Sequence, residues 1–155
     1  ELHLLDDWRH LKFIQSLGPE PLEVNLGQFK KMLSSKKTKI KPLLMDQTFI
    51  SGIGNIYAAE ILFRARIHPE RPANRLSDQE KELLLKEIKD TLKEAIHCGG
   101  SSIDDYIRLS GEPGSYVKHH KVYGRQGQPC LTCKTPIKRT VLGGRGTFFC
   151  PKCQK

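Results

Sequence analysis

The sequence lacks three features that would place the protein in a membrane or outside the cell. It has no run of about 18 apolar residues, so we expect no membrane-spanning helix. It has no basic start followed by an apolar segment, so nothing resembles a secretory signal peptide. The five cysteines are an odd number, and four of them form closely spaced pairs, which argues against a secreted disulfide framework. We therefore expect a cytoplasmic protein with no membrane partner.

Apolar residues are also scarce. They make up 37% of the 155 residues, a low share for one compact core, in a chain the size of one ordinary domain or two small ones. We expect a modest core and a second source of stability beside it. The chain starts at Glu1 without a methionine, and we expect it to be part of a longer protein.

Basic residues are abundant and unevenly placed. The net charge is +9, and it is −3 over residues 1–23, +6 over 24–72, −1 over 73–100 and +7 over 101–155. An excess of positive charge indicates polyanionic partners. If the two basic segments face the same way, they form one anion-binding surface; the alternative is an ordinary solvated surface rich in lysine.

Four cysteines have the spacing of a zinc site. Cys130 and Cys133 form one CxxC pair, Cys150 and Cys153 form another, and sixteen residues separate the pairs. Four thiolates leave no open coordination position, so the spacing predicts one structural zinc ion. The competing interpretation, a redox dithiol, is disfavoured because no βαβ pattern lies nearby. Zinc binding would supply much of the folding energy of this segment.

The clearest predicted helix lies in residues 76–100. Ser77 and Glu80 form a capping box at its start, and Gly99 and Gly100 end it. Cys98, in the last turn, is most simply a buried packing residue. The expected apolar stripe consists of Leu84, Ile88, Leu92, Ala95 and Ile96.

Shorter helices are predicted before it, and β-strands after it. Asn25 is a candidate N-cap for a helix in 24–37, and a second helix is expected in 38–48. A third, in 56–67, has Glu60 on its surface and an apolar face of Ile56, Ala59, Leu62 and Phe63. From Lys121 onward, short β-prone segments follow.

Two glycine-rich turns are candidate phosphate sites. In SGIGN, glycines precede Asn55 at the expected N-cap of a helix, where free N–H groups and the helix dipole favour anions. Nearby lysines strengthen this interpretation; they are Lys36, Lys37, Lys39 and Lys41. In GGRG, a turn between two strands presents Arg145, whose guanidinium binds phosphate bidentately. The alternatives are an unremarkable helix start and a plain hairpin with a solvated arginine.

Several strings together resemble one family. They are KPLLMDQTFISGIGNIYAAEILFRARIHPERPA, GGSSIDDYIRLSGEPGSY, VYGRQGQPCLTC and GRGTFFCPKCQK. From about Gly18 to Lys155, the chain resembles the C-terminal half of the formamidopyrimidine-DNA glycosylases. The last two strings are less similar to the related endonuclease VIII enzymes.

The resemblance implies a mainly α fold, a helix-two-turns-helix bundle followed by a small antiparallel β zinc ribbon. The implied divisions are a linker at 1–22, a DNA-binding domain at 23–120 with a lesion-covering loop, and a ribbon at 121–155. By position, Asn55 and Arg145 would hold phosphates beside an extruded nucleotide, and Arg145 would also assist elimination as a catalytic residue. The further residues expected to contact DNA are Lys36, Lys41, Ser101, Tyr106 and Tyr123. Cys130, Cys133, Cys150 and Cys153 match the zinc ligands.

The implied function is base excision of oxidised purines, 8-oxoguanine and formamidopyrimidines, from double-stranded DNA by a bifunctional glycosylase and AP lyase. The family's nucleophile is an N-terminal proline, which this chain lacks at Glu1. We therefore expect these residues to bind damaged DNA without catalysis. We also expect a bacterial, nucleoid-associated monomer.

Two other classes of function stay open from the residues alone. One is a non-catalytic module that binds DNA or structured RNA. Comparing its affinity for abasic-site DNA with its affinity for structured RNA would distinguish this class from a repair enzyme. The other is a zinc-ribbon interaction protein, whose binding would ignore salt between about 50 and about 300 mM.

Overall fold

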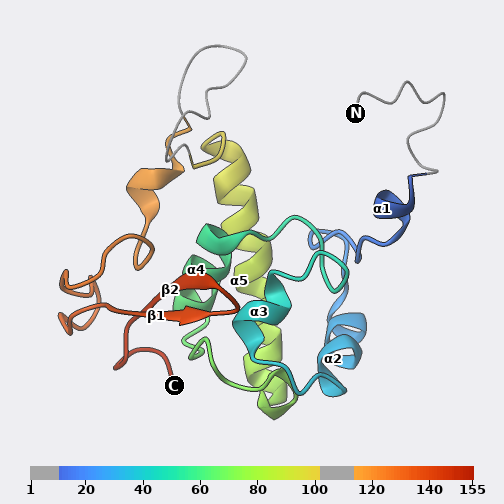
Figure 1. Cartoon of the computed structure of the whole chain (residues 1–155), viewed down its shortest axis with the longest axis horizontal. Helices are drawn as coiled ribbons and strands as arrows, with labels where there is room; N and C mark the ends of the chain where they lie inside the picture. The colour runs from blue at the N-terminus through green and yellow to red at the C-terminus, as the bar shows by residue number, and fades with distance from the viewer. Residues whose placement is uncertain (1–10, 102–113) are drawn as a thin grey trace.

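The computed structural model describes residues 11–101 and 114–155 (Figure 1). It confirms the expected fold class: helices followed by one antiparallel hairpin. The helices are α1 (Lys12–Gln15), α2 (Leu26–Ser34), α3 (Ile40–Leu44), α4 (Asn55–Arg64) and α5 (Asp78–His97), with 3₁₀ turns η2 (Ala73–Arg75) and η3 (Tyr116–His119). The strands are β1 (Lys138–Leu142) and β2 (Arg145–Phe149). Among the described helices, none is long and apolar enough to cross a membrane.

Local capping sets the starts of α2 and α5. The Asn25 side chain accepts a hydrogen bond from the Gln28 N–H at 2.9 Å, as expected for an N-cap. Ser77 and Glu80 form the predicted capping box, in which each side chain accepts a backbone N–H from the other residue. The α5 helix ends where Gly99 takes a positive φ of 67°.

The α4 helix is central to the molecule. It contacts α5 on one side and β2 on the other (Figure 1). The sequence predicted one apolar face, but residues 58–63 are all buried and Ile56 is only half-buried. The reason is that α4 contributes to two cores at once. One core contains mainly residues of the helical segment 24–92; the other joins Ala59 and Phe63 to Val122 and Ile137 of the ribbon segment.

The apolar stripe of α5 is shorter than predicted. Leu84 and Ile88 are fully buried, and Leu92 and Ala95 are almost so. Ile96 was expected in the same stripe, but its side chain is 68% exposed and is not part of the helical core. Cys98, expected to be buried, is half-buried.

The hairpin turn consists of two glycines. Gly143 and Gly144 have φ values of 57° and 73°, which a two-residue turn between right-twisted strands requires and which glycine adopts without strain. Across the strands, Thr140 pairs with Thr147 and Leu142 pairs with Arg145. The predicted turn is therefore confirmed, and Arg145 is the first residue of β2, directly after it.

Candidate metal centre and phosphate-binding site

The four cysteine sulfurs gather at one point. All four Sγ atoms lie within 4.8 Å of one another, with Cys133 and Cys150 3.4 Å apart and Cys130 and Cys153 3.9 Å apart. Tetrahedral coordination with Zn–S bonds of about 2.3 Å places sulfurs about 3.8 Å apart. The donor set therefore fits one zinc ion with a complete shell, which makes the centre structural.

The backbone around the sulfurs supports this geometry. Lys134 adopts a φ of 64°, and its N–H donates to the Cys130 carbonyl at 2.9 Å, closing the first cysteine turn. In the second turn, the Cys153 N–H donates to Cys150 Sγ at 3.4 Å. Donation to sulfur favours a thiolate, the form that binds metal.

Asn55 lies at the start of α4, but its role there differs from the prediction. Gly54, not Asn55, occupies the N-cap, and Asn55 is the first helical residue. Its side chain does not cap the helix, because Oδ1 accepts a hydrogen bond from Lys41 Nζ at 2.6 Å. This bond leaves the Asn55 amide hydrogens as donors for another acceptor.

The hairpin turn brings Arg145 to the same place. A Cβ added to Gly143 would lie 4.0 Å from the Pro42 side chain, so the turn packs against α3 (Figure 1). Lys41, next to Pro42, is 1% exposed. Its burial, together with the nearby charge of Arg145, lowers the pKa of Lys41 to about 8.

The resulting cluster of Lys41, Asn55 and Arg145 is suited to an anion. The lysine and the arginine carry positive charge, the asparagine offers an amide, and α4 adds the positive end of its dipole. Arg145 is exposed, and within the described residues no ion-pair partner of its guanidinium is found. A single phosphate group matches this set of donors in charge and in hydrogen bonding.

The other expected DNA-contacting residues lie elsewhere or outside the described residues. Lys36 is exposed after α2, close enough to Asp46 to help lower the pKa of that carboxyl, although Thr48 is the larger cause. Ser101 Oγ pairs with His120 Nε2 at 3.0 Å, and the Tyr123 ring packs on Phe148. Tyr106 and most of the expected lesion-covering loop lie outside the described residues.

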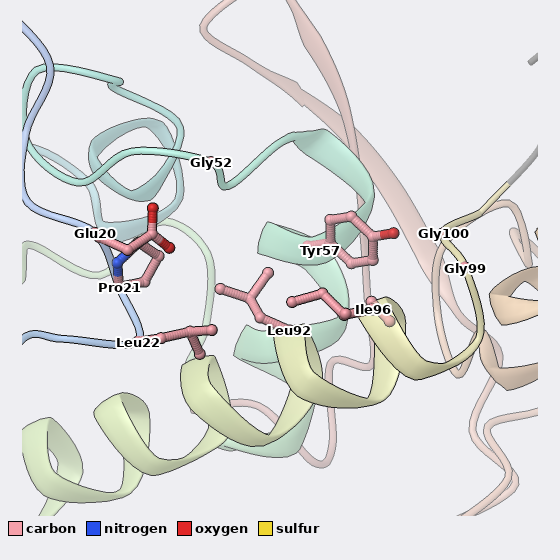
Figure 2. A pocket seen from close by; sticks show the side chains of 10 residues that line it. Glu20, Pro21, Leu22, Gly52, Tyr57, Leu92, Ile96, Gly99 and Gly100 are labelled. Carbon is pink, nitrogen blue, oxygen red and sulfur yellow. The ribbon is translucent and has the colours of Figure 1, made fainter. Parts of the chain in front are cut away.

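A mostly apolar hollow of about 400 Å³ lies beside the C-terminal end of α5 (Figure 2). The Tyr57 ring and Ile96 line it on one side, and Leu22 faces them from the segment before α2. Gly99 and Gly100 border it. Ile96, which is 68% exposed, thus borders this hollow instead of the helical core.

Glu60 is a site residue that the sequence did not reveal. It was expected on the surface of its helix, but its side chain is fully buried. Its two oxygens accept hydrogen bonds from the N–H groups of Lys121, Val122 and Tyr123, at 2.8 to 3.0 Å. These partners are 61 to 63 positions away in the sequence, so no local signal could identify them.

Sequence comparison matches two parts of the chain to known domain families. Residues 17–106 match the formamidopyrimidine-DNA glycosylase H2TH domain, and residues 127–155 match a zinc finger found in FPG and IleRS. The described fold and the four-cysteine centre agree with a helix-two-turns-helix protein that carries a zinc finger.

The chain belongs to the formamidopyrimidine-DNA glycosylase family. It is 49% identical over 144 residues to the formamidopyrimidine-DNA glycosylase of Solibacter usitatus, covering 93% of this chain and 54% of that protein. It is 46% identical over 146 residues to the Listeria innocua enzyme, with the same coverage of each chain. The chain thus spans about half the length of the relatives it matches.

Solved structures of the family have a fold similar to that of this chain. The crystal structure of the MutM (Fpg) protein from Thermus thermophilus superposes with a TM-score of 0.89 at 43% identity, covering 96% of this chain and 57% of that one. Lactococcus lactis Fpg in complex with abasic-site DNA gives a TM-score of 0.86 at 40% identity, covering 92% and 54%.

Proposed function

We propose that the chain is the DNA-binding part of a bifunctional glycosylase and AP lyase that removes oxidised purines from double-stranded DNA. One observation carries this proposal: Lys41, Asn55 and Arg145 come from three separate segments and form one cationic, hydrogen-bonding cluster. Such a cluster holds a DNA phosphate without reading a base.

The relatives support the choice of substrate. The Lactococcus lactis protein has been crystallised with DNA containing an abasic site and with DNA containing Fapy-dG. A formamidopyrimidine or an 8-oxoguanine must leave the base stack before its glycosidic bond can be attacked, at a cost of a few kcal/mol. Fixed phosphate contacts offset that cost by holding the distorted backbone.

The chemistry of the cluster suits binding and not base removal. Neither the amide of Asn55 nor the guanidinium of Arg145 is a nucleophile. Lys41 is buried, and its amine donates to Asn55. We therefore propose that attack at C1′ depends on residues outside these 155, while Arg145 stabilises negative charge on a phosphate during elimination.

The zinc ion would act at a distance from this chemistry. When bound to Cys130, Cys133, Cys150 and Cys153, it supplies only structural cross-linking, since the thiolates fill its shell. The ribbon then carries Arg145 on a rigid strand. We further propose that the protein works as a monomer on the bacterial nucleoid, in keeping with its net charge of +9.

A binding experiment with a trapping step tests this function. We expect the chain to bind a duplex containing a tetrahydrofuran abasic analogue more tightly than structured RNA, and to lose affinity steeply with salt. The slope of log affinity on log salt should be about 0.9 per neutralised phosphate. Borohydride should trap no covalent complex with abasic DNA; a trapped complex or excision of 8-oxoguanine would contradict the proposed division of labour.

A further inference from the structure

We propose that Glu60 is the positioning residue that sets the zinc ribbon on α4, so that Arg145 and Asn55 face the same phosphate. This inference rests on the proposed function for its ligand and on the geometry of Glu60 for its mechanism. Nothing in the binding cluster itself requires an acidic residue, and a buried carboxylate needs an explanation.

The Glu60 carboxylate binds the first residues of the ribbon segment through directional hydrogen bonds. Oε1 accepts from Val122 and Tyr123 at 3.0 and 2.8 Å, and Oε2 accepts from Lys121 at 2.8 Å. Three successive N–H groups that converge on one anion form a concave site with a defined orientation. The apolar contacts of Ala59 and Phe63 with the ribbon lack such directionality.

Glu60 connects the two segments that carry the phosphate-binding residues. It follows Asn55 by five residues on α4, a rise of about 7.5 Å. On the ribbon side, it holds Tyr123, whose ring packs against Phe148 with centroids 5.1 Å apart. Phe148 is on β2, the strand that begins at Arg145. A series of contacts therefore connects Asn55 through Glu60 to Arg145.

A second anchor holds the other end of the ribbon independently. Gln154 is 2% exposed, accepts from the Cys150 N–H at 2.8 Å and donates to the Ile67 carbonyl at 3.0 Å. Because this anchor and the zinc centre do not involve Glu60, loss of the carboxylate should leave the ribbon folded and attached. What changes is the angle at which the hairpin meets α3.

The test combines Glu60→Gln with Arg145→Ala in the full chain. A glutamine amide would present its NH₂ to one of the backbone donors, so at least one hydrogen bond is lost. We expect Glu60→Gln to weaken binding to a tetrahydrofuran-containing duplex about tenfold. We expect the salt slope to fall by about 0.9, and Arg145→Ala to add little in the Glu60→Gln background. Fully multiplicative losses would overturn the proposal.

Two controls separate positioning from folding. Glu82→Gln removes the same charge at an exposed position on α5 and should not weaken binding. Zinc content and the helical circular dichroism should be unchanged in Glu60→Gln and in the shorter Glu60→Asp. Loss of zinc in both variants would overturn the proposal, because Glu60 would then be needed for the ribbon fold and not for its placement.

A readout without DNA keeps this inference distinct from the proposed function. Arg145 contributes to the low pKa of Lys41, so the Lys41 side chain reports by NMR on the place of Arg145. In Glu60→Gln and in Arg145→Ala, the titration midpoint of Lys41 should rise, while Glu82→Gln leaves it at about 8. An unchanged midpoint in Glu60→Gln would overturn the inference even if the chain binds DNA as proposed.

Discussion

The helical segment and the ribbon segment are stabilised in different ways. The helical core consists of some twenty buried apolar residues between Val24 and Leu92. The ribbon core has few apolar residues, and two of its buried members are zinc-ligating cysteines. The comparison shows how a basic chain with little apolar content keeps a binding residue rigid: one half provides a packed platform, and the metal fixes a small finger upon it.

Removing the metal should have the largest effect, and it should affect only the ribbon segment. Cys150→Ser, or a strong chelator, should unfold residues 121–155 and leave the helices folded, because isolated zinc fingers gain about 10–16 kcal/mol from zinc. Amide hydrogen exchange measures both halves at once. Cys98→Ser, outside the metal centre, should change neither half, and simultaneous unfolding of both halves on chelation would contradict the division.

A core substitution in the helical half should have the next largest effect. Leu84 is fully buried on α5, and Leu84→Ala should lower the free energy of unfolding by about 2–5 kcal/mol. Its neighbour Leu83 is 36% exposed, so Leu83→Ala should cost much less. Urea denaturation gives both values. Equal losses would mean that α5 packs on a different face.

Lys41 is a buried charge at the junction of the two halves. Its pKa is lowered from the ordinary lysine value of 10.5 to about 8, chiefly by burial. Below pH 8, the folded and the unfolded chain are both protonated, so the cost of burying the charge is fully present. Between pH 8 and 10.5, the unfolded chain binds more protons, so stability should rise with pH.

The corresponding variant is Lys41→Met. It should be more stable than the parent by about 1–3 kcal/mol at pH 7, and this advantage should shrink as the pH approaches 10. Urea unfolding across this pH range checks the sign. Lys37→Met, at an exposed position, is the matched control and should show no such trend.

The smallest predicted effect concerns a helix cap. Ser77→Ala removes half of the capping box of α5 and should cost about 1 kcal/mol, without altering zinc content. Ser35→Ala, at the exposed end of α2, should cost less. Thermal melts give the melting temperature of each variant. A larger drop for Ser35→Ala than for Ser77→Ala would contradict a stabilising role of the cap.

Features encoded by neighbouring residues were predictable from the sequence. The caps at Asn25 and Ser77 depend on residues three positions apart, and the zinc site depends on two CxxC pairs. The fold class followed from these patterns and from the family resemblance.

Features that depend on distant residues were not predictable. Glu60 looked like a surface carboxylate because its three donors lie about sixty positions away. The Asn55 side chain was expected to cap α4, but Lys41, fourteen residues earlier, uses its oxygen. Ile96 continues the apolar period of α5, but in the folded chain it borders a hollow and not the core. In each case, tertiary contacts determine the environment of the side chain, and the local sequence pattern does not contain them.

The central claim is that Asn55 from the helical half and Arg145 from the ribbon bind one phosphate together. The most direct measurement is a double-mutant cycle of Asn55→Ala and Arg145→Ala on affinity for a tetrahydrofuran-containing duplex at fixed salt. The account predicts a coupling energy of about 0.5–3 kcal/mol between the two substitutions. Strictly additive losses would show that the two residues hold separate parts of the DNA, and would contradict it.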